Sequence, residues 1–273
     1  MGDHARLDPE IAGHYASVSE RQRLGPLDLE RVRTWELLGR YLPPPPAVVL
    51  DVGGAAGVYA LPLAARGYEV HLVDPVASHV EQALRASGQQ PATPLAGAAV
   101  GDARQLDRPD ASVDAALLLG PLYHLTGRAD RVRALTEARR VLRPVGMLAA
   151  AAISRFASTC DGLARGYLDE PGFEAIVERD VREGQHRNPS GRPEWFTTAY
   201  FHLPEELAQE LTEAGLRPRA VLAVEGPAWI LTDIQQRLAD PTRRERVLAA
   251  IRRVETEPSL LGASAHLLAV ASP

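Results

Sequence analysis

The chain has 273 residues, of which 45% are hydrophobic and 24% are charged, as is usual for a globular protein. Its formal net charge of −5 excludes the basic surface typical of proteins that bind nucleic acid or anionic membranes. The single cysteine, Cys160, excludes an internal disulfide and a cysteine-rich metal site, and we predict no metal site. Residues 1–10 lack a signal-peptide core, and no run of about 20 apolar residues is long enough to span a bilayer. We therefore expect a cytoplasmic protein.

The N-terminal segment, residues 1–46, is expected to be helical from about residue 9 to residue 42. Apolar residues such as Val32, Trp35 and Leu38 recur there at helical spacing. Four consecutive prolines, 43–46, end this helix because proline lacks the amide donor and restricts the residue before it.

Residues 47–153 form a core in which short apolar runs alternate with helical patterns. The predicted strands are 47–52, 69–74, 98–100, 113–119 and 147–153, and the predicted helices are 58–65, 76–86 and 128–142, with a turn at 143–146. This alternation predicts an α/β fold with a Rossmann-like, doubly wound, mostly parallel sheet.

The regular alternation stops after residue 153. Residues 154–202 are mixed and polar, and we interpret them as a cap insertion with one helix or two. Residues 203–273 are expected to complete the sheet through a helix at 204–214 and strands at 219–224 and 265–270. A second helical insertion is predicted at about 230–256.

A glycine-rich turn follows the first predicted strand and reads Asp51-Val52-Gly53-Gly54-Ala55-Ala56-Gly57. Glycines permit a tight turn and let a ligand approach the backbone closely. Asp74 ends the second strand, where an acid can accept hydrogen bonds from both hydroxyls of a ribose. Ligands of such sheets bind beyond the carboxyl ends of the strands, so both features are expected at one site.

Two observations disfavour a nicotinamide dinucleotide at this site. Counted from Gly53 or from Gly54, the residue two positions on is alanine, whereas the G-x-G-x-x-G fingerprint needs glycine. In addition, the Asp51 carboxylate before the turn would repel a pyrophosphate, but it suits a ligand with an ammonium and a sulfonium. An oxidoreductase and a non-catalytic ligand sensor or partner protein remain as alternatives.

Residues 47–153 resemble the core of class I S-adenosylmethionine-dependent methyltransferases, close to the ubiquinone/menaquinone small-molecule group. The turn matches that family's D-x-G-x-G-x-G motif, with Ala55 at the middle glycine. The resemblance implies that Asp74 binds the ribose and that Asp102 contacts the adenine. It also implies a C-terminal antiparallel strand pair and methyl transfer from S-adenosylmethionine to a small-molecule acceptor.

The expected cofactor contacts follow from the motif and from its place in the sheet. They are Tyr15, Asp51, Gly53, Gly54, Gly57, Asp74, Pro75, Gly101, Asp102, Ala103 and Leu119. Tyr15 is included because an N-terminal segment often closes over the cofactor in related methyltransferases.

Two histidines are candidate general bases, because imidazole titrates near neutral pH. His124 follows the fourth predicted strand, and His202 follows the aromatic residues Trp195, Phe196, Tyr200 and Phe201. His124 is alternatively a histidine that hydrogen-bonds its loop, and the aromatics form either an acceptor pocket or the core of the cap. The sequence leaves open whether the acceptor atom is O, N or C, and whether the protein is a monomer or a homodimer.

Overall fold

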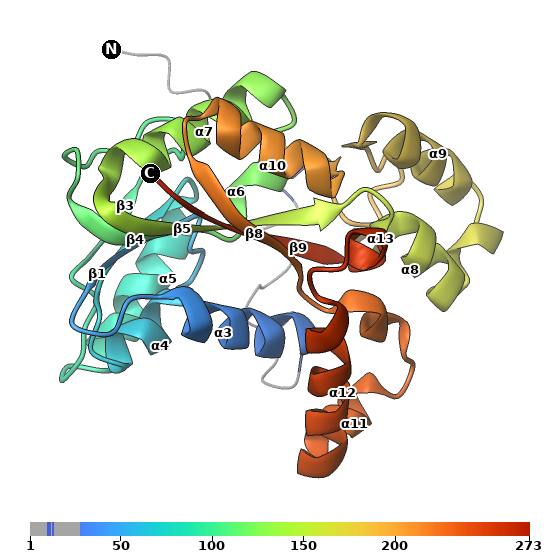
Figure 1. The fold of residues 1–273 in the computed structure, drawn as a ribbon. Helices are drawn as coiled ribbons and strands as arrows, with labels where there is room; N and C mark the ends of the chain where they lie inside the picture. Colours follow the sequence, from blue (N-terminus) through green and yellow to red (C-terminus); the bar gives the residue numbers. More distant parts are fainter. Residues whose placement is uncertain (1–9, 12, 14–27) are drawn as a thin grey trace.

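The computed structural model describes residues 10, 11, 13 and 28–273 (Figure 1). Its apolar runs form a sheet whose first five strands in chain order are parallel: β1 (Val48–Val52), β2 (Glu69–Asp74), β3 (Gly97–Val100), β4 (Val113–Leu118) and β5 (Leu142–Ser154). The spatial order is β3-β2-β1-β4-β5. Because strand order reverses between β1 and β4, a crevice forms at their carboxyl ends.

The C-terminal strands β8 (Arg217–Ala223) and β9 (His266–Ser272) complete the sheet. Strand β9 is antiparallel to both β5 and β8, and its first residue, His266, pairs with Ile153 near the end of β5. The predicted fold class, including the antiparallel pair, is confirmed. As a consequence, β9 begins at the edge of the sheet where the parallel strands end.

Helices cover both faces of the sheet (Figure 1). One face carries α3 (Leu29–Tyr41), α4 (Ala60–Ala65) and α5 (Ala77–Gly88), whose buried residues Leu37, Leu63 and Ala83 share a core with the strands. The other face carries α7 (Arg128–Val141) and α10 (Pro204–Glu213), which contribute Leu135 and Leu211 to the second core. The short helix α6 (Pro121–His124) directly follows β4.

Helix α3 begins at Leu29, within the helix that the sequence predicts from about residue 9 to residue 42. Asp28 is its N-cap and accepts a hydrogen bond from the amide of Arg31 at 3.4 Å, which satisfies one of the free amides of the first turn. The helix ends at Tyr41, just before the prolines. Residues 14–27, including Tyr15, lie outside the described residues.

The predicted turn at 143–146 is a bulge within β5. Leu142 pairs with Val113, and pairing with β4 resumes at Met147 opposite Ala115. The residues between them leave the regular ladder, and Val145 is 88% exposed. The sequence signal was correct about the irregularity but wrong about where the strand begins, because β5 already pairs with β4 before the bulge.

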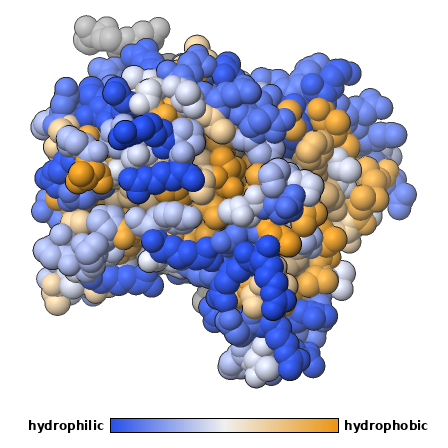
Figure 2. Space-filling model, in the orientation of Figure 1, coloured by the Kyte–Doolittle hydropathy of each residue, from blue (hydrophilic) through white to orange (hydrophobic). Residues whose placement is uncertain are grey.

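The cap contains α8 (Ala157–Arg165), the 3-10 turn η1 (Tyr167–Asp169), α9 (Phe173–Glu183), β6 (Gln185–His186), the 3-10 turn η2 (Pro193–Trp195) and β7 (Ala199–His202). The buried carboxylate of Asp180 joins these parts, because it accepts a hydrogen bond from Ser158 at 2.6 Å and lies 2.8 Å from His186 Nδ1. Strand β7 then pairs in parallel with the end of β5. Figure 2 shows hydrophobic residues gathered on the side of the molecule where the cap lies.

The second insertion forms η3 (Gly226–Ile230), α11 (Ile234–Ala239), α12 (Pro241–Val254) and α13 (Pro258–Leu261). Helices α11 and α12 project from the body beside the start of α3 (Figure 1). Throughout the described part of the chain, no helix combines the length and the apolar character needed to cross a bilayer.

Candidate active site

A cavity lies at the carboxyl ends of β1, β2, β3 and β4, and we call it the strand-end cavity. Its lining includes Asp51, Gly53 and Gly54 at the end of β1, Asp74, Pro75 and His79 at the end of β2, Gly101 to Arg104 after β3, and Leu119 to Pro121 and Tyr123 to Leu125 after β4. Residues of α3 and β9, together with Ala151 of β5 and Val224 directly after β8, close it. This is the position that the topology predicts for a ligand of a doubly wound sheet.

The turn after β1 needs glycine at two positions. Gly53 has a φ of +71°, and a Cβ there would lie 2.8 Å from a ring carbon of Pro121. A Cβ on Gly54 would lie 2.8 Å from Oδ2 of Asp51. The amides of both glycines point at the carbonyl oxygen of Val73, at 2.7 and 3.3 Å. Glycine at both positions therefore lets the turn pack closely against Pro121, Asp51 and β2.

Asp51 is a buried acid beneath this turn, with 1% of its surface exposed. Its Oδ2 atom has no hydrogen-bond partner among the described residues. Burial, together with the nearby charge of Asp74, raises the pKa of Asp51 to about 7. An unsatisfied buried carboxyl oxygen is costly unless a donor or a positive charge approaches, so this position favours a cationic ligand group.

Asp74 ends β2 with its carboxylate turned to the turn. Oδ2 accepts a hydrogen bond from the amide of Ala55 at 2.8 Å. Oδ1 accepts one from Val76 at 2.9 Å and lies 3.1 Å from Nδ1 of His79. Because a carboxylate has about four acceptor positions, Asp74 retains capacity for a ligand hydroxyl.

Asp102, which the resemblance assigned to the adenine, forms a bidentate ion pair with Arg104. The contacts are 3.0 Å from Nε to Oδ1 and 2.6 Å from the second guanidinium nitrogen to Oδ2. Burial opposes ionisation of Asp102, but the hydrogen bonds from Arg104 outweigh it and lower the pKa of Asp102. Both side chains line the strand-end cavity, so a ligand there would contact the ion pair of Asp102 and Arg104 and not a lone carboxylate.

The structure brings together most of the predicted cofactor contacts. Nine of them line the strand-end cavity: Asp51, Gly53, Gly54, Asp74, Pro75, Gly101, Asp102, Ala103 and Leu119. Gly57 is not among the lining residues; its φ is +84°, and a Cβ there would lie 3.0 Å from Leu61. Glycine at position 57 therefore allows the positive φ and the close contact with Leu61 at the start of α4.

The two candidate histidines have different environments. His124 lines the strand-end cavity, with Nδ1 3.5 Å from the carbonyl oxygen of Thr198. His202 lines neither of the cavities described here and is 0% exposed. Its Nε2 lies 3.3 Å from Glu210, which is paired with Arg131 at 2.7 Å. The position of His202 therefore supports a structural role and does not support the predicted role as a base.

A second cavity, the cap cavity, has a volume of about 570 Å³ and lies between the cap, the start of α3 and the second insertion. Trp195, Phe196 and Phe201 line it. Tyr200 is not part of the lining, and the guanidinium of Arg131 lies 3.6 Å from the centre of its ring. The aromatic residues of the cap thus divide between cavity wall and internal packing.

Three described residues line both cavities: Glu30, Tyr123 and His266. Glu30 lies in the first turn of α3, and His266 is the first residue of β9. The two cavities therefore share these side chains in their walls. Sequence reasoning missed Glu30 and His266 because neither belongs to a local motif.

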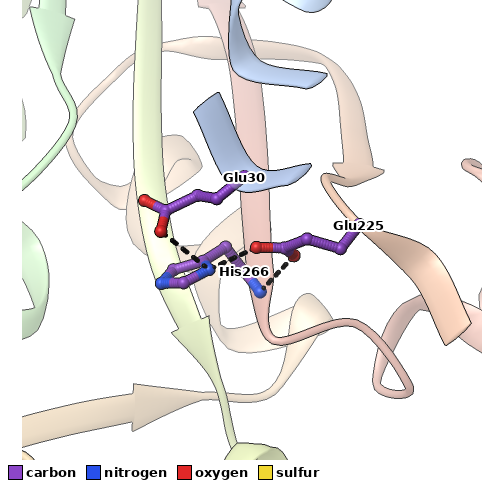
Figure 3. Close-up of side chains that lie close together, drawn as sticks. All are labelled: Glu30, Glu225 and His266. Carbon is purple, nitrogen blue, oxygen red and sulfur yellow. Dashed lines mark hydrogen bonds and ion pairs between the residues drawn. The ribbon is translucent and has the colours of Figure 1, made fainter. Parts of the chain in front are cut away.

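His266 is held by Glu225, the second residue after β8 (Figure 3). Oε1 of Glu225 lies 2.6 Å from Nδ1 of His266, and Oε2 accepts hydrogen bonds from Ser264 and from the His266 amide, both at 2.9 Å. A carboxylate oxygen of Glu30 lies 3.8 Å from the same Nδ1. The nitrogen and oxygen atoms of the three side chains that could bind a metal ion lie within 4.8 Å of one another. The carboxylate of Glu225, however, is already satisfied by hydrogen bonds. We interpret the three side chains as a polar cluster.

Comparison with known proteins agrees with this architecture. A family model described as a methyltransferase domain matches residues 50–150. The ubiquinone/menaquinone biosynthesis C-methyltransferase UbiE of Acidiphilium cryptum is 31% identical over 219 residues, which cover 77% of this chain and 78% of that protein. The chain belongs to the S-adenosylmethionine-dependent methyltransferases.

Other proteins similar to this chain show partial matches or the fold alone. An uncharacterized methyltransferase of Mycobacterium tuberculosis is 36% identical over 113 residues, and the chain spans about two fifths (42%) of that relative's length. The CcbJ methyltransferase of Streptomyces caelestis aligns over 99% of both chains with a TM-score of 0.59 and 16% identity. A methyltransferase of Methanosarcina mazei has a TM-score of 0.58 and 19% identity, and covers 86% of this chain and 96% of its own.

The strand-end cavity of this chain fits the family's cofactor, S-adenosylmethionine. The unsatisfied oxygen of Asp51 suits a ligand with a positive charge. Gly53 and Gly54 line the cavity without side chains of their own, and Asp74 has acceptor capacity for a sugar hydroxyl. The residues present therefore match an ammonium group, a ribose and a close backbone approach.

Proposed function

We propose that this protein transfers a methyl group from S-adenosylmethionine, bound in the strand-end cavity, to a small-molecule acceptor bound in the cap cavity. The observation that carries the proposal is the junction of the two cavities at Glu30, Tyr123 and His266. A methyl group moves only between atoms in near contact. Donor and acceptor sites that share a wall meet this requirement.

The residues of the strand-end cavity bind and orient the cofactor in this proposal. Asp74 accepts a hydrogen bond from a ribose hydroxyl, and the pair of Asp102 and Arg104 borders the adenine. The buried carboxyl group of Asp51, beneath the glycine turn, attracts the ammonium. When bound, S-adenosylmethionine supplies an electrophilic methyl group. The protein contributes position and electrostatics to this chemistry.

The cap cavity has the properties of a small-molecule site. Its volume of about 570 Å³ lies within the range of roughly 300–1,000 Å³ that is typical of ligand pockets. Aromatic side chains from the cap form part of its wall and exclude water from the acceptor. Of the two histidines predicted from the sequence, His124 lies nearer to this chemistry, since it lines the strand-end cavity.

A thermal-shift assay tests the proposed cofactor. We expect S-adenosylmethionine and S-adenosylhomocysteine to raise the melting temperature and NAD to leave it unchanged, since ligands that bind the folded state stabilise it. Gly53→Ala places a Cβ against Pro121 and abolishes this shift. Gly88→Ala, where a Cβ meets nothing within 4 Å, preserves it. Stabilisation by NAD alone would overturn the proposal, and binding of the methyl donor without turnover of any acceptor would favour the non-catalytic alternative.

A further inference from the structure

We infer that His266, held by Glu225, takes a proton from the methyl acceptor, and that the acceptor is an amine that enters as an ammonium ion beside Glu30. The inference rests on the proposed function and names the base and the chemical class of the substrate. It follows from the position of three side chains at the junction of the cavities (Figure 3).

The topology of the sheet explains why these residues meet. Strand β8 is parallel to the main strands, so Glu225 follows its carboxyl end, whereas antiparallel β9 begins at that same edge with His266. Helix α3 begins above this point and brings Glu30 from its first turn. The site is therefore built from the part of the sheet that closes the fold.

Glu225 has the environment of a residue that positions another. It is 3% exposed, and Ser264 and the His266 amide fix one carboxylate oxygen. The other oxygen lies 2.6 Å from Nδ1 of His266. A carboxylate on one ring nitrogen stabilises the imidazolium and fixes the tautomer with its lone pair on the other nitrogen. Nε2 of His266, on the far side of the ring from Glu225, is therefore the proton acceptor.

Charge at the junction favours an amine over an alcohol. Two carboxylates, Glu30 and Glu225, surround the single imidazole, with Glu30 3.8 Å from Nδ1. Negative charge disfavours the oxyanion that develops from a hydroxyl and favours an ammonium. The aromatic side chains of the cap cavity, such as Phe196 and Phe201, add favourable contacts to an organic cation.

The proton transfer balances as follows. An N–H bond of the ammonium breaks, its electron pair remains on the nitrogen as a lone pair, and the proton bonds to the lone pair of Nε2. The positive charge passes from the amine to the imidazole, where Glu225 stabilises it. The neutral amine now has the lone pair that accepts the methyl group. His266 returns the proton to solvent, so one proton is released for each methyl group transferred.

Binding tests the substrate class without any turnover. The probes are two pairs of matched compounds, 2-phenylethylamine with 2-phenylethanol and tryptamine with tryptophol, titrated by calorimetry into protein saturated with S-adenosylhomocysteine. At least one amine should bind about tenfold more tightly than its alcohol, a difference of about 1.4 kcal/mol, since a hydrogen bond between charged groups is stronger than one from a neutral hydroxyl. Glu30→Gln should remove this preference, and Glu174→Gln, an exposed residue of α9 that lines neither cavity, should keep it. Equal binding of amines and alcohols, or no binding of either amine, would overturn the inference.

The rate of methylation of the amine that binds tests the role of His266 as the base. His266→Gln should lower kcat by about 100-fold or more, the usual effect of removing a general base. Glu225→Gln should lower kcat in the same direction while KM stays unchanged, as expected of a positioning residue. An unchanged kcat in His266→Gln would overturn the assignment. Glu225→Gln, whose side chain does not line the strand-end cavity, should bind S-adenosylhomocysteine like the wild type; weak binding by the wild type itself would instead contradict the proposed function.

Discussion

The carboxylate of Asp74 accepts a hydrogen bond from the amide of Ala55 at 2.8 Å, so the end of β2 holds the turn that follows β1. Ala55 is also the residue that departs from the family's glycine pattern, and its φ is +45°. One side chain therefore fixes the conformation of the turn and faces the cavity in which the ligand binds. The next three predictions concern this turn.

Asp74→Asn should weaken the binding of S-adenosylhomocysteine by roughly 1.5–3 kcal/mol, because it removes a charged acceptor from the ribose site. The amide group of asparagine also faces the Ala55 or the Val76 amide, so the melting temperature should fall. Calorimetric titration and thermal unfolding measure the two effects separately. Asp107→Asn, at an exposed position outside both cavities, is the matched control and should bind normally. Unchanged affinity in folded Asp74→Asn would remove this residue from the site.

Asp51 should make the stability of the ligand-free protein depend on pH. Its pKa is about 7 in the folded chain and 3.8 for an ordinary aspartate. A raised pKa contributes stability below 3.8 that is lost as the pH rises towards 7, so the stability of the wild type relative to Asp51→Asn falls over this window. The difference amounts to about 2 kcal/mol between roughly pH 5.5 and pH 8.

Urea unfolding of the wild type and of Asp51→Asn at these two pH values measures the effect. Near pH 8 the variant should be the more stable protein and should nevertheless bind S-adenosylmethionine more weakly, because it lacks the charge that attracts the ammonium. Equal pH dependence in the two proteins would show that Asp51 ionises normally.

Ala55→Gly should stabilise the protein slightly and preserve cofactor binding. An alanine in the left-handed region of backbone conformation destabilises the folded protein by about 1–2 kcal/mol, and glycine removes this strain. The greater conformational freedom of glycine in the unfolded chain cancels about 0.4–1 kcal/mol of this gain in stability. Ala56→Gly is the matched control, since Ala56 is not among the residues with positive φ, and it should destabilise. Denaturant unfolding of both variants checks the prediction, which a less stable Ala55→Gly would contradict.

Glu210 should prove important for stability and unimportant for the cofactor. Burial alone would raise its pKa, but hydrogen bonds from His202 and Arg131 outweigh burial and hold the pKa of Glu210 well below its ordinary value. Glu210→Gln leaves Arg131 buried without its ionised partner, so the free energy of unfolding should fall by about 3–5 kcal/mol.

The neighbouring pair on the same helix provides the control. Glu213 is exposed and pairs with Arg128 at 2.9 Å, and Glu213→Gln should cost at most about 1 kcal/mol. Both variants should bind S-adenosylhomocysteine with normal affinity while folded. If Glu210→Gln unfolded like the wild type but bound S-adenosylhomocysteine more weakly, His202 and its partners would have to be part of the active site.

The sequence predicted the half of the site that depends on local patterns. Strand β2 has the predicted bounds, because its alternating apolar run ends at an acid followed by proline. The glycines after β1 and the acid at Asp74 lie within one strand-turn-helix-strand unit, whose spacing alone places them at a common edge. These residues line the strand-end cavity as predicted.

The other half depends on how distant strands pair, and local patterns do not show this. His266 reaches the site only because Ile153 is its partner in the ladder between β5 and β9. Nothing near residue 266 encodes that register. His202 shows the converse: it follows an aromatic run that suggested a pocket, but β7 aims its side chain at Glu210 and away from both cavities.

A crystal structure of the protein with S-adenosylhomocysteine is the most direct test of the central claim, that the methyl group is delivered where the two cavities meet. We predict the ribose at Asp74 and the sulfur at the junction formed by Glu30, Tyr123 and His266, facing the cap cavity. A sulfur atom turned away from that junction, or a ligand bound outside the strand-end cavity, would contradict the account.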